Sequence, residues 1–280
     1  MSDDDLVLRP GPDGARLVRD RAYPRAYTLR VGRTDQSYVD LDEPRRLEFD
    51  YLEQIAVVVD TAAAVGEPVR AVHIGGAAMS LARYVAATRP RSAQLIFEPD
   101  TELTAFVRTH LPLPRRSGIR VRGIDGRSGV AGLPNGYADL VIVDAFVGPR
   151  TPAELTTLEC WVDLHRVLRA SGTVIMNITD RGPLGYARRV LAGLAARFAH
   201  RLLMAESSTL KGRRFGNVIL VGSDRQLPTD QIAAAAGRVL YPYRVLFGAR
   251  LTQLLADATP FTDREAEESP LPPRGRTYFA

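Results

Sequence analysis

The chain has 280 residues and a formal net charge of +5, and 45% of its residues are hydrophobic. This length suits a single α/β domain, with enough apolar residues for a large core. No apolar run reaches the length of a membrane span, and the single cysteine, Cys160, excludes an intramolecular disulfide framework. The acidic start MSDDD lacks the apolar region of a signal peptide, so we expect a cytoplasmic protein with no membrane partner.

Arginine supplies nearly all of the positive charge, since Lys211 is the only lysine. Most of the arginines lie beside predicted loops, which is typical of solvated surfaces and predicts no nucleic-acid partner. The stretch RRSGIRVR, residues 115–122, is the part of the chain that would favour an anionic substrate.

The predicted elements form two unequal parts between a mobile N-terminus, residues 1–20, and a proline-rich tail, residues 263–280. The first part, residues 21–66, has two short alternating strands and then one helix with apolar residues at helical spacing. The ranges of these three elements are 26–32, 36–42 and 45–65.

In the second part, residues 67–262, strands alternate with helices. The strands are predicted at 69–75, 93–99, 118–125, 138–146, 172–179, 200–206 and 215–223, and the helices at 79–88, 101–111, 153–168 and 185–198. The link between the last two strands is too short for a helical crossover, so this pair should be antiparallel. The pattern predicts a Rossmann-like doubly wound seven-stranded α/β sheet that ends in an antiparallel hairpin.

The turn after the first strand of this sheet reads GGAAMS from Gly75 to Ser80. A dinucleotide fingerprint needs glycine where the backbone approaches a pyrophosphate, and Met79 would crowd that group. A nucleoside without phosphates needs less, namely Gly75 and Gly76 for close approach and then a helix N-terminus. A tight turn that binds no ligand is the alternative.

Three carboxylates follow the next strands. Glu98, 22 residues after Gly76, can accept two hydrogen bonds from ribose hydroxyls. Asp125, which precedes Gly126, can accept from an adenine amino group, although Asp-Gly also favours an Asx turn or a helix N-cap. Asp144 ends the most apolar strand and can orient a substrate, accept a proton or cap a loop. Together the strand ends predict a pocket for adenosine without pyrophosphate, which suits S-adenosylmethionine.

These motifs resemble those of the spermidine synthase-like branch of the S-adenosylmethionine-dependent methyltransferase superfamily, over residues 27–222. Residues 51–53 are similar to its Tyr-His/Gln-Glu motif, and residues 74–80 to its Ile-Gly-Gly-Gly-Asp-Gly-Gly loop. FEPDTEL and IDGRSG resemble its Glu-Ile-Asp and Gly-Asp-Gly/Ala segments, and VIVDAFVGPRTPAEL resembles its Asp-Ser-Ser-Asp segment.

The resemblance implies S-adenosylmethionine or its decarboxylated form as the cofactor, with Glu98 on the ribose and Asp125 on the adenine. Gly75, Gly76 and Gly126 would complete the cofactor site, and Asp144 would contact the same cofactor. The resemblance also implies a small N-terminal β-domain and a homodimer.

The sequence departs from the family pattern at positions where the family has residues that bind the substrates or take part in the reaction. The loop aspartate that holds the amino end of the donor is Ala78, the second aspartate of Asp-Ser-Ser-Asp is Val147, and the middle residue of Tyr-His/Gln-Glu is Leu52. Lost acids leave little to compensate the desolvation of a polyamine. We therefore predict methyl transfer to a small, less cationic acceptor, with Asp144 as the catalytic base and Tyr51 assisting.

Two alternatives stay open. An aminopropyltransferase that uses decarboxylated S-adenosylmethionine would need displaced acids, for which Glu154, Glu159 and Asp180 are candidates. A non-catalytic module would bind a nucleoside or a protein partner through the fold alone. His73 could assist Asp144, but a histidine within a strand is more often part of the core. The four histidines lack ligand-like spacing, so no metal site is predicted.

Overall fold

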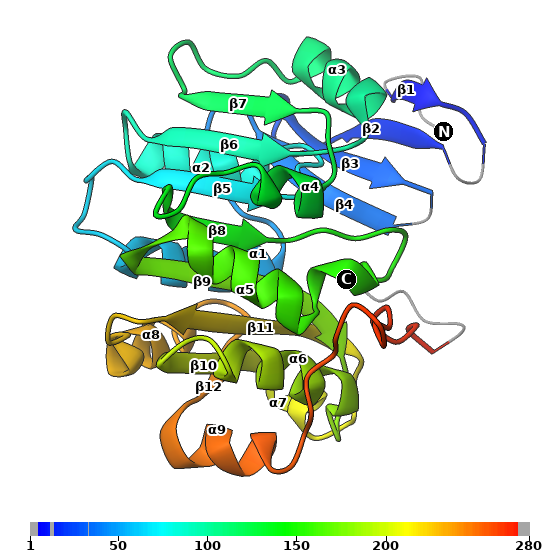
Figure 1. Cartoon of the computed structure of the whole chain (residues 1–280). Coiled ribbons are helices and arrows are strands. Elements are labelled where there is room, and N and C mark those ends of the chain that lie inside the picture. The colour runs from blue at the N-terminus through cyan, green and yellow to red at the C-terminus, as the bar shows by residue number, and fades with distance from the viewer. Residues whose placement is uncertain (1–4, 12–13, 33, 274–280) are drawn as a thin grey trace.

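The computed structural model describes residues 5–11, 14–32 and 34–273, which form two sheets (Figure 1). In this part of the chain an antiparallel four-stranded sheet has the order β1-β2-β3-β4. Its strands are β1 (Leu6–Arg9), β2 (Ala15–Arg19), β3 (Ala26–Val31) and β4 (Thr34–Asp40).

The central sheet has the order β12-β10-β11-β9-β8-β5-β6-β7. Its strands are β5 (Arg70–Ile74), β6 (Ala93–Phe97), β7 (Ile119–Arg122), β8 (Ala138–Val143), β9 (Leu168–Asp180), β10 (His200–Glu206), β11 (Gly216–Ser223) and β12 (Tyr243–Leu246). Strands β5 to β9 pair in parallel, whereas β11 pairs antiparallel with both β9 and β10. The predicted doubly wound sheet with a terminal antiparallel hairpin is confirmed.

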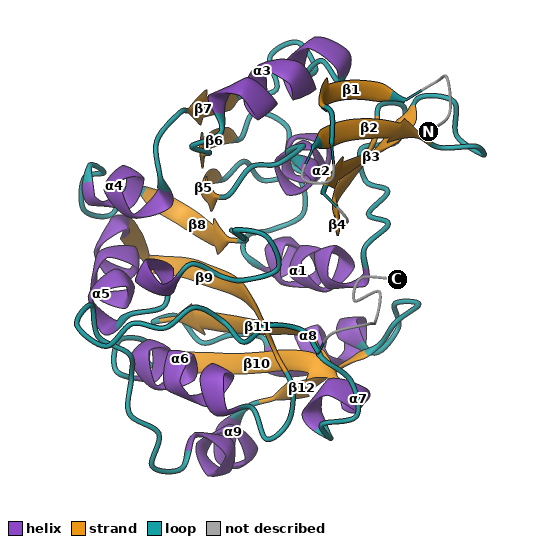
Figure 2. Cartoon of the chain, turned by 90° about the vertical axis from the view of Figure 1, so that its right-hand side faces the viewer, coloured by secondary structure: helices purple, strands orange, loops and turns teal. Residues whose placement is uncertain are grey.

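Helices cover both faces of the central sheet (Figure 2). One face carries α4 (Gly126–Ala131), α5 (Leu158–Val167) and α6 (Gly185–Ala195). The other carries α1 (Asp50–Thr61), α2 (Ser80–Thr88) and α8 (Thr229–Ala236). The remaining helices are α3 (Thr101–His110), the 3-10 turn η1 (Ala153–Leu155), α7 (Ser207–Leu210) and α9 (Gly248–Leu255). No helix of the described ranges is long and apolar enough to cross a membrane.

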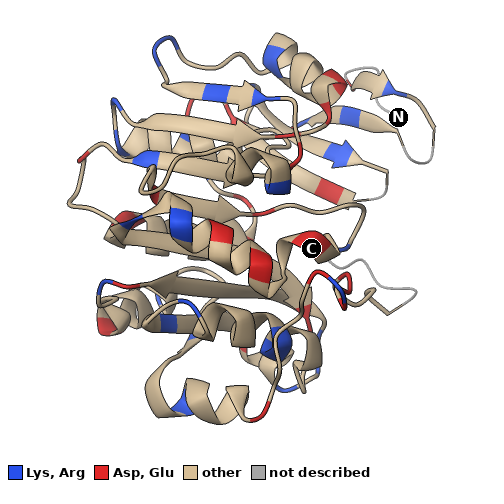
Figure 3. Ribbon diagram, viewed as in Figure 1, with Lys and Arg blue, Asp and Glu red and all other residues tan. Residues whose placement is uncertain are grey.

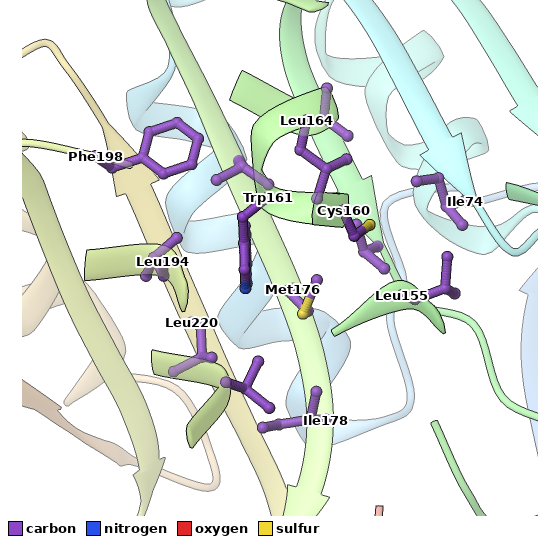
Figure 4. Close-up of a cluster of buried hydrophobic side chains, with 14 of the residues drawn as sticks. Ile74, Leu155, Cys160, Trp161, Leu164, Met176, Ile178, Leu194, Phe198 and Leu220 are labelled. Carbon is purple, nitrogen blue, oxygen red and sulfur yellow. The ribbon is translucent and has the colours of Figure 1, made fainter. Parts of the chain in front are cut away.

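The largest buried cluster lies between the central sheet and helices α5 and α6 (Figure 4). Trp161 is fully buried and meets Phe198 edge-on, with ring centroids 6.3 Å apart. A Cβ on Gly193 would lie 2.4 Å from Cδ1 of Trp161, so only glycine lets α6 approach this ring. Cys160 is buried in the same cluster, as expected of a core residue.

The N-terminus differs from the sequence-based expectation. We predicted residues 1–20 to be mobile, but Leu6–Arg9 and Ala15–Arg19 are strands. A short alternation of buried and more exposed residues explains the strand Ala15–Arg19. Ala15 and Leu17 are buried against α2 and α3, while their neighbours in the strand face outward. Residues 1–4 of that prediction lie outside the described part of the chain.

One further difference lies after residue 223. An eighth strand, β12, joins the predicted seven by pairing with β10, and α8 and α9 flank it. The described part of the proline-rich tail contacts the loop after β8, where the Ser269 hydroxyl accepts a hydrogen bond from the Thr151 amide at 2.8 Å. Residues 274–280 of the predicted tail lie outside the described residues.

Arg89 is a buried arginine that closes the end of α1. Its side chain is 2% exposed. The guanidinium donates hydrogen bonds to backbone carbonyls of the last turn of α1 and the loop after it, at Val59, Asp60, Ala63, Ala64 and Glu67. The carbonyl groups that a helix leaves unpaired at its C-terminus are therefore satisfied by one side chain.

We expect Arg89→Met to lower the free energy of unfolding by about 3 kcal/mol, because several buried carbonyls lose their donor. Urea unfolding followed by circular dichroism measures this change. Arg108→Met, at an exposed position of α3, is the matched control and should change stability by less than about 0.5 kcal/mol. Equal losses in the two variants would contradict the role assigned to Arg89.

Candidate functional site

All seven residues predicted for the site line one cavity of about 200 Å³. We call it the strand-end cavity, because it lies at the carboxyl ends of β5, β6 and β8, where ligands of such sheets bind. The seven residues are Tyr51, Gly75, Gly76, Glu98, Asp125, Gly126 and Asp144.

The turn after β5 keeps a glycine-like backbone without its full set of glycines. Gly75 has φ +89°, and a Cβ there would lie 2.3 Å from the Asp144 carbonyl oxygen. Ala77 and Met79 also adopt positive φ, at 38° and 65°, which costs a residue with a side chain about 1–2 kcal/mol. Both line the strand-end cavity, so the strained backbone shapes the surface that a ligand would touch.

Glu98 is the acid at the end of β6, and it holds the turn in place. Its Oε2 atom accepts from the Gly76 amide at 2.9 Å and the Ala77 amide at 3.2 Å. Its Oε1 atom accepts from the Asp100 amide at 3.0 Å. A carboxylate offers about four acceptor positions, so roughly one remains for a ribose hydroxyl. Contact with two ribose hydroxyls would require Glu98 to lose one of its hydrogen bonds from the turn amides.

Asp125 is both part of the cavity lining and a helix N-cap. Its carboxylate accepts from the Ser128 amide at 2.8 Å, and this bond lowers the pKa of the exposed Asp125 carboxyl. The capping role that Asp-Gly favours is therefore present. A Cβ on Gly126 would lie 2.1 Å from Cγ2 of Ile74, so the glycine allows α4 to pack against β5.

Asp144 follows β8 and is held by two neutral donors. Asn177 donates through Nδ2 at 3.0 Å, and the Tyr51 hydroxyl donates at 3.4 Å. Burial raises the pKa of the Asp144 carboxyl to about 6, although both hydrogen bonds oppose this rise. Burial also raises the pKa of Tyr51 well above its usual value, so its hydroxyl stays protonated. A carboxylate with a pKa near neutrality suits proton transfer.

Sequence reasoning missed Asn177, although the sequence carried a signal. A polar residue interrupts the apolar run VIMNI of β9. Val143 pairs with Met176 in the parallel register, so the next residue on each strand is Asp144 and Asn177. The register of two strands therefore brings this pair together.

His73 belongs to the core rather than to proton transfer. Its ring nitrogen Nε2 lies 2.9 Å from the Gln94 amide oxygen, and burial lowers the pKa of His73 to about 4. The ring is thus neutral at physiological pH and fixed by its partner.

A second cavity, of about 390 Å³, shares Gln36, Tyr51 and Phe146 with the strand-end cavity. We call it the acidic cavity, because five carboxylates line it against one arginine, Arg214. These acids come from β4, α1, β10 and the loop before α1: Asp35, Glu48, Asp50, Glu53 and Glu206. Sequence reasoning placed Glu53 in a family motif but not in a site, and it missed the other four.

The electrostatics of the acidic cavity favour a positive ligand. Burial raises the pKa of Asp50, and the neighbouring Glu206 raises it further. Burial also raises the pKa of Glu53, and the nearby charge of Asp50 adds to the rise. Like charges that hinder one another's ionisation are relieved by a cation.

Two buried amides point to the same kind of ligand. Asn177 is fully buried and Asn217 is 6% exposed, and both line the acidic cavity. Neither side-chain oxygen has a hydrogen-bond partner among the described residues. A buried acceptor without a donor is costly, so both oxygens are suited to N–H groups of a ligand.

Known structures share this architecture. A probable spermidine synthase from Corynebacterium glutamicum matches with a TM-score of 0.84 and 28% identity, over 89% of this chain and 93% of that chain. A spermidine synthase in complex with the transition-state analogue AdoDATO matches with a TM-score of 0.62 and 11% identity, over 89% of this chain and 87% of that one. Human methyltransferase-like protein 13 in complex with SAH matches with a TM-score of 0.52 and 19% identity, over 76% of this chain and 93% of that chain.

The latter two matches show the fold alone. No protein-family model matches the sequence, and neither does any curated protein. The match with the Corynebacterium structure covers 89% of the chain. The chain has the fold of the spermidine synthase-like branch of the S-adenosylmethionine-dependent methyltransferase superfamily.

Two positions where this spermidine synthase-like chain departs from the family motifs lie in different surroundings. Ala78 is fully buried and does not line the strand-end cavity, whereas Ala77 and Met79 on either side do. Val147 lines the cavity and is 69% exposed. The first replacement therefore fills core space, and the second places an apolar side chain at the rim.

The three displaced acids considered for aminopropyl transfer are mostly elsewhere in this spermidine synthase-like fold. Glu154 lines the strand-end cavity. Glu159 accepts from the Asp263 amide at 3.0 Å, and buried Asp180 accepts from the Ala187 amide in the first turn of α6 at 2.9 Å. Two of the three are therefore committed to backbone groups.

Proposed function

We propose that this chain is an S-adenosylmethionine-dependent transferase that methylates a cationic amine. The observation that carries the proposal is the acidic cavity, which adjoins Tyr51 and Asn177 beside the Asp144 carboxylate. Its carboxylates change the expectation of a less cationic acceptor, because acids absent from the sequence motifs are supplied from other elements.

The strand-end cavity supports S-adenosylmethionine rather than its decarboxylated form as donor. With Ala78 buried in place of an aspartate, the turn has no acid to hold a lone amino group. The donor carboxylate would instead meet an uncharged turn that leads into the N-terminus of α2, where the helix dipole favours a negative group. Glu98 and Asp125 fit the ribose and adenine of either form.

In this mechanism Asp144 takes the proton from the ammonium group of the acceptor, and Tyr51 and Asn177 hold the carboxylate in position. The freed nitrogen lone pair forms a bond to the methyl carbon, the carbon–sulfur bond breaks, and its electron pair stays on sulfur. The donor brings an already activated methyl group, so the chain contributes mainly alignment. The proton then leaves Asp144 for water.

The test is transfer of a labelled methyl group from S-adenosylmethionine to a panel of aliphatic amines and matched neutral alcohols. We expect label in the amines alone. Asp50→Asn combined with Glu206→Gln should raise the KM for the amine at least about 10-fold, because each charged hydrogen bond contributes roughly 1.5–3 kcal/mol. Glu159→Gln, outside both cavities, is the matched control. Donor binding without transfer to any amine would favour a non-catalytic module.

Aminopropyl transfer is a second candidate, because the same five carboxylates suit a diamine and the Corynebacterium neighbour is described as a probable spermidine synthase. Incubation with decarboxylated S-adenosylmethionine and putrescine separates the two reactions. Spermidine as the main product, with no methylated amine, would replace the methyl-transfer proposal.

A further inference from the structure

An arginine-lined depression of about 620 Å³ lies on the central sheet, away from both cavities described above. None of its lining residues lines the strand-end cavity or the acidic cavity. Four arginines border it: Arg70 at the start of β5, Arg91 before β6, and Arg120 and Arg122 on β7. Basic segments on β7 and at the start of β5 are visible in Figure 3.

The strand register places three of these side chains on one sheet face. Arg120 pairs with Leu95 and Arg122 with Phe97, and both partners belong to the cluster beneath α4 to α6. Arg70 is two residues before Val72, a member of the same cluster. Side chains two residues apart on a strand share a face and lie about 6.6 Å apart.

These arginines lack acidic partners. Within the described residues, the guanidinium groups of Arg91, Arg120 and Arg122 have no hydrogen bond or ion pair. The Arg70 guanidinium bonds to the Tyr137 carbonyl oxygen at 3.4 Å and lies 5.0 Å from the centre of that ring. Four positive charges thus border one depression, and within the described residues no carboxylate forms an ion pair with their guanidinium groups.

Protection of an exposed sheet edge explains only part of this arrangement. β7 is the last strand in the order, and charged residues on edge strands prevent pairing with other chains. That accounts for Arg120 and Arg122. Arg70 lies two strands further in, and Arg91 lies in the turn before β6, so the charge extends beyond the edge strand.

We propose that the arginine-lined depression binds a compact ligand that carries a chain of two or three phosphate groups. Guanidinium groups bind phosphate oxygens through paired N–H donors, and spaced arginines match successive phosphates. The volume of the depression lies in the range of small-ligand sites. Inorganic polyphosphate and a nucleoside polyphosphate share this chemistry.

Calorimetry with inorganic tripolyphosphate and adenosine triphosphate tests the proposal on the full chain. We expect the triple variant Arg91→Glu, Arg120→Glu and Arg122→Glu to bind tripolyphosphate about 100-fold more weakly than wild type, and the corresponding glutamines to bind at intermediate strength. Exposed arginines away from the depression provide a control with the same change in net charge: Arg197→Glu, Arg238→Glu and Arg250→Glu. This control should bind within about threefold of wild type.

The variants distinguish a nucleotide ligand from inorganic polyphosphate, and they define the results that would overturn the proposal. Stronger binding of adenosine triphosphate than of tripolyphosphate, lost in the triple variant, assigns a nucleotide. Adenosine triphosphate binding that survives in the triple variant but is lost in Glu98→Gln belongs to the strand-end cavity and overturns the proposal. Equal weakening in both charge-reversed variants, binding to single-stranded oligonucleotides alone, or no binding by wild type also overturns it.

Discussion

Replacing Asp144 with asparagine should lower the turnover number at least about 100-fold, which is the usual contribution of a positioned general base. The substitution keeps the size of the side chain and its contact with Tyr51, but it removes the group that accepts the proton. Donor affinity should fall less, by at most about 10-fold, because Glu98 and Asp125 remain. Single-turnover transfer from labelled S-adenosylmethionine and calorimetry with the same donor measure the two effects separately.

The pH dependence of the reaction provides an independent check on Asp144. The active form is the carboxylate, and burial raises its pKa to about 6. The value of kcat/KM should therefore be constant above this pKa and fall about tenfold per pH unit below it. Asp144→Asn should lack this acidic limb, whereas Asp257→Asn, whose side chain is 97% exposed, should retain it. An unchanged acidic limb in Asp144→Asn would assign the proton transfer to another group.

The strand-end cavity could be predicted from the sequence because its residues follow strands directly. The carboxyl ends of parallel strands meet at one edge of the sheet, so Glu98, Asp125 and Asp144 converge without any knowledge of side-chain contacts. The N-cap role of Asp125 was one of the alternatives that its Asp-Gly sequence favoured. The bonds of Glu98 to its own turn could not be predicted, because they depend on backbone positions that only the structure gives.

The acidic cavity could not be predicted in this way. Asp50 and Glu206 are 156 residues apart, on a helix and a strand that have no sequence motif in common. An acid in the first turn of a helix is also common for a general reason, namely the helix dipole, so Asp50 carries no specific signal. The cavity arises from tertiary packing of α1 against the strand ends, which composition and periodicity do not encode.

The short N-terminal strands were missed for a different reason. Residues 1–20 are rich in glycine, proline and aspartate, which predicts irregular structure. The run ARLVR is too short to stand out, but Leu17 pairs with both Leu6 and Leu29 across the sheet. Pairing with distant strands thus overrides local composition.

Replacing Glu98 with glutamine should weaken donor binding about 100-fold, or roughly 3 kcal/mol. Two effects add. The neutral amide forms a weaker hydrogen bond to the ribose than the carboxylate does, since charge-assisted bonds are about twice as strong. In addition, the amide nitrogen has donors only, so it cannot replace an oxygen that now accepts from the amides of Gly76, Ala77 or Asp100. The turn that shapes the cavity would lose part of its support.

Calorimetry with S-adenosylmethionine and S-adenosylhomocysteine measures this effect without any acceptor. Glu102→Gln is the matched control, because its side chain is 65% exposed and its ion pair with Arg9 contributes little. Asp125→Asn should weaken binding less than Glu98→Gln, because Asp125 is exposed and supports no part of the turn after β5. Donor affinity within about threefold of wild type in Glu98→Gln would mean that the nucleoside is held elsewhere, and the assignment of the strand-end cavity would then be wrong.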